Sequence, residues 1–488
     1  MRRALATLAL ALTSFATFAQ PAAPVPQRHP DVARFIKVDA PRVVLTHVRV
    51  IDGLGNPPVE DRNLVIEAGK ITSITPGADV PAATGQTVLD LRGATVIPGL
   101  VGMHDHLFHI ARPNLRADGS SEGPVLVPQM TFSAPRLYLA AGVTTIRTTG
   151  SVEPYSDLNL KRLVDEGRLI GPHIHVTAPY LEGTGSPFLQ MHPLKGAEDA
   201  TRFVNYWADQ GATSVKAYMH ITRAELKAAC DAALARGLKV TGHLGSVTYD
   251  EAADLGIDNL EHGFLVNTQL DPGKQPDKPS SSPLGTTSNA MDPEGPVAKA
   301  LFTKLIAKKI AVTSTLPVFE HMVPSRPPLR PLALDVMSPQ AREAFLYARA
   351  RAAGRSPEGP LATFRRAMAL ERAFVAAGGL LIAGCDPTGN GGTIPGISDW
   401  REVELLVEAG FTPVEAIRIA THNGAVFLGI QDRIGAIAPG MDADLLVVRG
   451  NPAESIEAIE KVELVFKGGL GYDPAKLFDS VKGRYGQY

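Results

Sequence analysis

The sequence predicts an α/β protein made of a (β/α)8 barrel and a small β-sandwich domain that both ends of the chain form together. Short apolar runs alternate with amphipathic helical segments through residues 98–432, which is the order expected of a barrel. Strand-rich segments precede and follow this region. No glycine-rich phosphate loop follows an apolar run, which weighs against the alternative of an open doubly wound sheet.

The N-terminus has the pattern of a secretory leader. Arg2 and Arg3 supply positive charge, an apolar stretch follows, and Thr17-Phe18-Ala19 forms a small-x-small cleavage site. A buried N-terminal helix is the alternative. The apolar stretch is too short to span a bilayer, so we expect an exported protein, periplasmic or secreted, without a membrane span. The expected divisions are a signal peptide at 1–19, a Pro-rich linker at 20–40, a composite β domain at 41–97 and 433–488, and the barrel at 98–432.

The composition is that of an ordinary globular protein. Of 488 residues, 44% are hydrophobic and 20% are charged, which excludes a disordered or collagen-like chain. The net charge of -2 provides no electrostatic footprint for nucleic acid or an anionic membrane, so we expect a small-molecule partner. Cys230 and Cys385 are the only cysteines, so no disulfide framework is expected, although a single bridge between them stays open.

The strands are expected from apolar runs bounded by glycine and proline. For the β domain these runs are 43–53, 63–74, 87–91, 94–97, 443–448 and 462–469. For the barrel they are the run before His104 and then 144–147, 173–176, 214–218, 239–243, 257–262, 310–313 and 380–383. The clearest barrel helix covers 222–236, where Thr222 and Glu225 have the spacing of a capping box.

Two segments interrupt this alternation. Residues 268–296 are rich in Pro, Ser, Gly, Asp and Thr, and we expect a long mobile loop over the functional face of the barrel. Residues 317–360 are rich in arginine, with helical character over 340–353. Most of these arginines are expected to be solvated, and a clamp for a substrate carboxylate is the alternative for one of them.

Chemistry-bearing residues close the apolar runs of the predicted barrel. The set comprises His104, His106, Lys216, His243, His262 and Asp386. In a barrel the carboxyl ends of the strands meet at one mouth, so these side chains should converge there. A lone H-x-H is more often an ordinary surface or core pair, but imidazoles with a carboxylate are the ligands that zinc prefers. The pattern therefore predicts a metal site.

Several longer stretches resemble the amidohydrolase superfamily, in particular its metal-dependent prolidase-like and imidazolonepropionase-like branch. The matching residues are 96–106, 142–145, 215–216, 242–243, 261–263, 384–386 and 438–445. The resemblance implies two divalent metals, usually zinc, bridged by a lysine that carbon dioxide has carboxylated. Carried over by position, His104, His106 and Asp386 hold one metal, His243 and His262 hold the other, and the Lys216 carbamate holds both.

The chemistry of such a site explains these residue types. A free lysine would repel two cations, whereas its carbamate is an anion with two oxygens. Water between the metals becomes the nucleophile while one metal polarises the scissile carbonyl. Asp386 is the catalytic candidate that accepts the proton of this water and passes it to the leaving nitrogen.

Substrate contacts are less sharply marked. Tyr218 lies two residues beyond Lys216 and could bind a substrate carboxylate or the developing oxyanion, with a structural tyrosine as the alternative. His220, His192 and Arg147 are further candidates for substrate binding, although a supporting or loop-packing role is the favoured interpretation for each. His109, His173 and His175 are interpreted as structural, and Cys385 as a buried thiol that faces the helix layer.

These observations predict a binuclear metal-dependent hydrolase that cleaves an amide or peptide-like C–N bond. The prolidase-like resemblance suggests a dipeptide or N-acyl amino acid with a free carboxylate. The alternatives are hydrolysis of a cyclic amide, lactone or phosphotriester at the same metal pair, or an inactive binding protein that keeps the barrel. A single-metal deaminase is disfavoured because that chemistry does not need Lys216. A homo-oligomer stays open.

Overall fold

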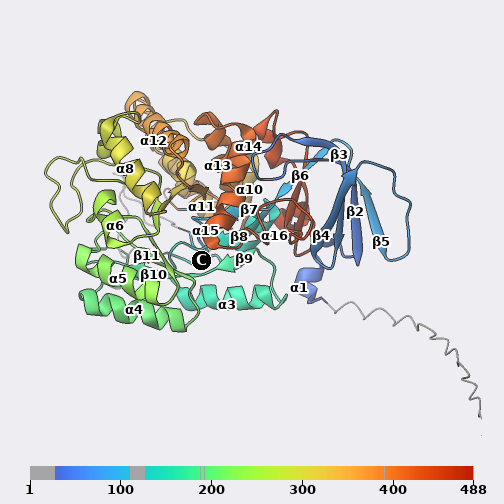
Figure 1. Cartoon of the computed structure of the whole chain (residues 1–488), viewed down its shortest axis with the longest axis horizontal. Coiled ribbons are helices and arrows are strands. Elements are labelled where there is room, and N and C mark those ends of the chain that lie inside the picture. The colour runs from blue at the N-terminus through green and yellow to red at the C-terminus, as the bar shows by residue number, and fades with distance from the viewer. Residues whose placement is uncertain (1–27, 110–126, 187, 192, 389–390, 487–488) are drawn as a thin grey trace, which may run out of the picture.

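The computed structural model describes residues 28–109, 127–186, 188–191, 193–388 and 391–486. The expected signal peptide, the first part of the expected linker and His192 lie outside the described residues. In Figure 1 the β domain lies at one side of the molecule, with β2, β3, β4 and β5 furthest from the barrel helices. Among the described residues, no helix is long and apolar enough to cross a membrane.

Both ends of the chain contribute strands to the β domain, as the sequence predicts. Its nine strands are hydrogen-bonded into one sheet in the order β1-β18-β17-β16-β6-β2-β3-β4, with β5 also paired to β2. They are β1 (Ile36–Val38), β2 (Arg42–Val50), β3 (Val59–Glu67), β4 (Lys70–Pro76), β5 (Gln86–Asp90), β6 (Ala94–Pro98), β16 (Leu445–Arg449), β17 (Val462–Lys467) and β18 (Leu470–Tyr472). Alternate side chains such as Val43, Leu45, Leu464 and Phe466 form its apolar core.

The segment expected as a linker contains two regular elements. Within it, α1 (Pro30–Ala33) is followed by β1, which pairs antiparallel with β18. Phe35, between the two elements, is buried in the apolar core. The β domain therefore begins before residue 41, because a short apolar stretch after the Pro-rich region finds a free sheet edge.

Parallel strands build the barrel in two arcs. The first arc is β7 (Leu100–Gly102), β8 (Val143–Arg147) and β9 (His173–His175), and the second is β10 (Thr177–Leu181), β11 (Ser214–Ala217), β12 (Lys239–Gly242), β13 (Asn259–Glu261), β14 (Ala311–Ser314) and β15 (Leu381–Ala383). Only Val176 separates β9 from β10, so together they act as the third strand. The Met103 amide donates to the Ala383 carbonyl and the Asp386 amide to the His104 carbonyl, both at 2.8 Å, which brings the first and last strands together.

The first barrel strand differs from the expected one. The apolar run before His104 forms β6, which belongs to the β domain through its pairing with β16. The chain then turns at Gly99, where a Cβ atom would clash with Thr144, and β7 starts the barrel. One continuous apolar run therefore serves both domains, which its pattern alone does not reveal.

Helices follow the barrel strands and cover their outer faces (Figure 1). Those that alternate with the strands are α2 (Ala134–Ala140), α3 (Pro154–Asp165), α4 (Ala197–Asp209), α5 (Arg223–Ala235), α6 (Tyr249–Leu255), α8 (Pro296–Ala307), α12 (Glu358–Ala376) and α13 (Ile397–Glu408). The remaining ones are α7 (Thr286–Ala290), α9 (Leu316–Glu320), α10 (Pro331–Val336), α11 (Pro339–Ala353), α14 (Pro413–Ile419), α15 (His422–Leu428), α16 (Pro474–Val481) and a 3₁₀ turn, η1 (Ile456–Glu460). The predicted capping box of Thr222 and Glu225 is confirmed at the start of α5.

Both interrupting segments make specific contacts. In 268–296, Asp277 pairs with Arg223 of α5 at 3.0 Å. In 317–360, Arg326 pairs with Glu408 at 2.6 Å and Arg330 with Glu404 at 2.7 Å. These two arginines therefore bind acidic residues of α13, in place of the solvated state expected for most of the set.

Candidate active site

All six predicted ligands line one cavity at the carboxyl ends of the barrel strands. Lys216 lies within β11, His243 and His262 directly follow β12 and β13, and Asp386 follows β15. His104 and His106 lie just beyond the end of β7. The cavity is also lined by Phe108, Val127, Val152, Tyr180, Phe188, Met191, Tyr218, Val318, Phe319 and Thr388. The barrel thus gathers residues that lie far apart in the sequence, as the strand-end argument predicts.

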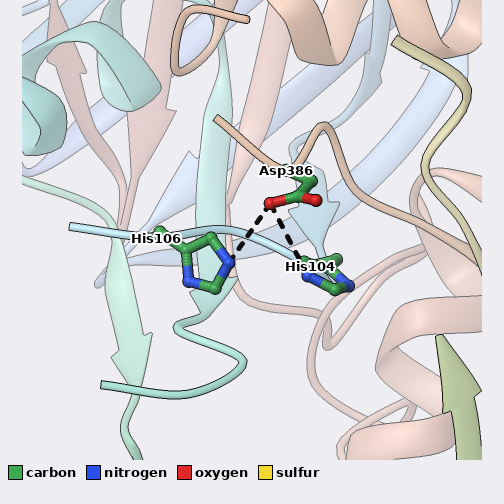
Figure 2. Close-up of side chains that lie close together, drawn as sticks. All are labelled: His104, His106 and Asp386. Carbon is green, nitrogen blue, oxygen red and sulfur yellow. Dashed lines mark ion pairs between the residues drawn. The ribbon is translucent and has the colours of Figure 1, made fainter. Parts of the chain in front are cut away.

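The most compact part of the site is formed by His104, His106 and Asp386 (Figure 2). Oδ1 of Asp386 lies 3.3 Å from Nε2 of His106 and 3.7 Å from Nε2 of His104. One donor atom from each residue lies within 4.8 Å of the others, and all three side chains are buried. This is the spacing at which one cation can be shared by three ligands.

Hydrogen bonds at the far side of the two rings fix their orientation. Nδ1 of His106 donates to the carbonyl of Thr148 at 2.8 Å, and Nδ1 of His104 donates to Oε2 of Glu261 at 2.6 Å. Each Nε2 atom is thereby left as the acceptor that faces Asp386. Partners of this kind set the tautomer and direction of metal-binding histidines.

The other two histidines continue the same group. The ring centroids of His104 and His262 are 4.5 Å apart, as are those of His262 and His243. Nδ1 of His262 lies 2.8 Å from the Thr315 hydroxyl. Two backbone positions of the site, His262 with φ 68° and Asp386 with φ 51°, have left-handed conformations that are costly for residues other than glycine. Such strain is typical of functional positions.

The buried environment favours the protonation states that metal binding needs. Burial, reinforced by the nearby Lys216, lowers the pKa of His243 to about 3 and that of His104 well below its ordinary value. Burial alone would raise the pKa of Asp386, but His104, His106 and the Thr388 hydroxyl together hold it below its usual range. Neutral imidazoles and an ionised carboxylate are the forms that bind metal.

Lys216 is fully enclosed at the base of the cavity. Burial lowers the pKa of its ammonium group to about 8, although Glu261 and Asp386 oppose the change. The amine is therefore uncharged in part of the molecules near neutral pH. An uncharged amine is the nucleophile that carbon dioxide requires, so the residue fits a role as a carbamate bridge.

Arg147 lies inside the barrel, away from the cavity lining. Its side chain is 1% exposed, and Nη2 donates to Asn259 and to Oε1 of Glu261, both at 2.8 Å. The guanidinium is held by a carboxylate and a carbonyl within the barrel, which agrees with the supporting role favoured for Arg147 over a substrate contact. Glu261 joins Arg147 to His104, a role that sequence reasoning missed. Its position next to His262 in the matching stretch 261–263 is the sequence feature that could have indicated this role.

Of the remaining candidates for substrate binding, one lines the cavity and one does not. Tyr218 lines the cavity, 5.2 Å from the His243 ring and 4.8 Å from the Tyr180 ring. His220 does not line it, and its Nδ1 lies 3.3 Å from Oε2 of Glu182. His192 lies outside the described residues. His109 is buried against the Tyr485 ring, in agreement with its structural interpretation.

A second buried cluster lies beside the proposed metal ligands. Asp105, Cys385 and Asp399 have donor atoms within 4.8 Å of one another. The Cys385 thiol lies 3.4 Å from Oδ1 of Asp105 and is fully buried. This agrees with the interpretation of Cys385 as a thiol that faces the helix layer. Both cysteines are free.

A barrel of parallel strands with four imidazoles, a carboxylate and a lysine at one mouth defines a class of metal-dependent hydrolases. The sequence matches the amidohydrolase family over residues 95–470. The chain belongs to this family, whose members are enzymes that act on carbon–nitrogen bonds.

Curated relatives match only over short stretches. Adenine deaminase 1 of Latilactobacillus sakei is 41% identical over 66 residues, which cover 14% of this chain and 10% of the relative. Imidazolonepropionase of Pseudomonas entomophila is 48% identical over 48 residues, which cover 10% and 12%. The chain thus spans about a tenth of the length of these relatives.

Solved structures match over nearly the whole chain. A putative prolidase from Bifidobacterium longum has a TM-score of 0.64 at 23% identity, covering 91% of this chain and 99% of that one. A Xaa-Pro dipeptidase with bound methionine in its active site has a TM-score of 0.65 at 22% identity, covering 88% and 100%. At these identities the likeness shows the shared fold.

Proposed function

We propose that the protein is a binuclear metal-dependent hydrolase that cleaves the amide or peptide-like C–N bond of a dipeptide or an N-acyl amino acid. The observation that carries the proposal is the position of Asp386, whose Oδ1 lies within 3.3 and 3.7 Å of two imidazole nitrogens that face it. The prolidase-like fold supports a peptide-like substrate.

The donor set suits two divalent cations, with zinc as the usual metal of such sites. His104, His106 and Asp386 would hold one, His243 and His262 would hold the other, and Lys216, once carboxylated, would contribute to both. When bound, the metal pair supplies an acidified water and an electrophile for the scissile carbonyl. The protein contributes neutral donors, a fixed ring orientation through Glu261 and Thr148, and three ligand side chains that are buried.

Asp386 transfers the proton in this proposal. Its carboxylate projects into the cavity, and the Thr388 hydroxyl donates to its Oδ1 at 2.9 Å. Because its pKa is held below the ordinary range, the group is ionised before the reaction and can accept the proton of the attacking water. It then delivers this proton to the leaving nitrogen, which departs as a neutral amine.

Tyr218 is placed to stabilise the charge that develops on the carbonyl oxygen. Burial raises the pKa of its hydroxyl, so the group remains protonated and can donate a hydrogen bond. Among the described cavity residues, Lys216 is the only lysine or arginine. Since Lys216 is proposed to bridge the metals, no other described cation of the cavity pairs with a substrate carboxylate, and the free carboxylate stays a prediction.

The reaction is tested by incubating metal-loaded protein with matched panels of dipeptides, N-acyl amino acids, lactones and phosphotriesters. Amine release from the first two panels, abolished by a chelator and by Asp386→Asn, is the expected result. Release of ammonia from an aminopurine would favour a deaminase, which the names of the curated relatives suggest. Turnover of lactones or phosphotriesters alone would favour the alternative of a lactone or phosphotriester hydrolase, and binding without turnover in any panel would favour an inactive binding protein.

Export is part of the same proposal. Arg2, Arg3 and the small residues at 17 and 19 support a cleaved leader. N-terminal sequencing of the protein recovered from outside the cytosol should begin at Gln20, whereas recovery of the uncleaved chain in the cytosol would contradict it.

A further inference from the structure

One side of the cavity is apolar and touches the proposed metal ligands directly. We call this surface the apolar wall; it consists of Phe108, Val127, Val152, Tyr180, Phe188 and Met191. The Phe108 ring stacks on the His106 ring at 4.3 Å with an angle of 22°. The apolar surface therefore begins next to a metal ligand, where a substrate group beside the scissile bond would lie.

The apolar wall combines Tyr180, which lies within β10, with residues of three segments that follow different barrel strands. Phe108 and Val127 follow β7, Val152 follows β8, and Phe188 and Met191 follow β10. None of these segments is a regular helix or strand at those positions. Their relative positions therefore depend on contacts between them.

Gln190 provides such a contact. Its Oε1 accepts the Val127 amide at 2.7 Å, and its Nε2 donates to the Val127 carbonyl at 2.9 Å. The same Nε2 donates to Oε1 of Glu153 at 3.1 Å. One side chain thus joins segments after three strands, although it does not itself line the cavity.

We propose that the apolar wall binds a large apolar or aromatic group of the substrate next to the scissile bond, and that Gln190 is the positioning residue that holds it together. This inference rests on the proposed function for the site and names its substrate class: amides and dipeptides with a leucine- or phenylalanine-like side chain. Six apolar or aromatic side chains beside the catalytic group leave a small or charged substituent without compensating contacts.

The first test is a series of N-acetyl amino acids with glycine, alanine, leucine and phenylalanine side chains. For metal-loaded protein we expect kcat/KM to rise roughly fourfold for each methylene group that the wall buries. Binding of the same series is measured in parallel by calorimetry with the Asp386→Asn variant. Equal affinity for all four compounds would overturn the proposed role of the apolar wall. Affinity that rises with side-chain size, without turnover by the wild type, would support this role and reject the proposed reaction.

Two substitutions test whether the apolar wall causes the preference for large side chains. Met191→Gln should raise KM for the leucine and phenylalanine compounds about tenfold with little change for glycine, because it places an amide on the apolar surface at similar volume. Met322→Gln, at a methionine that is 55% exposed, is the matched control. Equal effects of the two substitutions would contradict the assignment.

Gln190→Glu tests the positioning role. A glutamate cannot donate to the Val127 carbonyl, and it places a carboxylate beside Glu153. We expect KM for the apolar compounds to rise several-fold while kcat with the glycine compound and the metal content stay at the wild-type values. Gln210→Glu, at an exposed glutamine directly after α4, is the control. A parallel fall of kcat for every compound would indicate general damage and overturn the specific role.

Discussion

At the scale of single residues, the site depends on carboxylates and carbonyls that orient the proposed ligands. Glu261 is fully buried and serves both His104 and Arg147. Burial alone would raise its pKa, but Arg147, Lys216 and the Thr241 hydroxyl keep it lower, so it remains an anion beneath the cavity. This charge holds Nδ1 of His104 as a donor and leaves Nε2 for a metal.

Replacement of Glu261 by glutamine should weaken metal binding by roughly 10- to 100-fold, because the amide is a weaker partner for His104 and leaves Arg147 without its counter-ion. Competition with a chelator measures the affinity. Glu454→Gln, at an exposed position, should leave it unchanged. Unaltered affinity in Glu261→Gln would show that His104 is oriented by other contacts.

Sequence reasoning located the six proposed ligands because each one closes an apolar run. It did not distinguish residues that line the cavity from buried residues that hold the cavity residues in place. Arg147 and Lys216 are both basic residues near the end of a barrel strand, yet Arg147 is neutralised by Glu261 inside the barrel and Lys216 lines the cavity. Which interior charges pair depends on the strand neighbours across the barrel, and spacing along one strand does not contain that information.

At the scale of elements, local signals were sufficient where a short stretch determines its own structure. Thr222 and Glu225 form the predicted capping box because both partners lie within one helical turn. Residues 94–97 lie in the β domain as expected, but the first barrel strand was not distinguished from this run, because distant pairing decides where each strand belongs. β6 joins β16 from the other end of the chain, and only β7 belongs to the barrel.

One buried carboxyl group at a contact between two elements should make the stability depend on pH. Glu371 of α12 accepts a hydrogen bond from the Ser314 hydroxyl of β14 at 2.8 Å. Burial raises the pKa of this carboxyl from 4.5 to about 8. The folded protein therefore keeps a proton that the unfolded chain releases, so the free energy of unfolding falls as the pH rises from 4.5 to 8.

Glu371→Gln places an uncharged side chain at this position at every pH. It should therefore remove part of the decrease in the free energy of unfolding between pH 4.5 and pH 8. Relative to the wild type, we expect the variant to gain roughly 1 to 3 kcal/mol between pH 5 and pH 8.5. Denaturant midpoints at both values measure the change, with Glu358→Gln at the exposed start of the same helix as control. A gain that is the same at both values would contradict a protonated Glu371.

At the scale of the whole molecule, the last segment packs against both domains. α16 packs on α2 as well as on β17, and Leu477, Val481 and Tyr485 belong to the main core. The expected division placed 433–488 in the β domain. An amphipathic helix after the last strand gives no local sign of the surface that its apolar face will cover, so this attachment was not predictable from the pattern.

Leu477→Ala should lower the free energy of unfolding by about 2 to 5 kcal/mol, because it leaves a cavity between α16 and the main core. Leu234→Ala, at a leucine that is 79% exposed on α5, should have little effect. Urea denaturation of the two variants compares them directly. Similar small changes in both would mean that α16 is not required for the stability of the barrel.

The metal content of the full chain tests the central claim most directly. Elemental analysis of the protein purified without chelators should find close to two divalent ions per chain. Lys216→Ala should bind fewer and lose turnover together with the metal, because the proposed bridge between the two ions is gone. A single ion in the wild type, or two ions with full turnover in Lys216→Ala, would contradict the binuclear site.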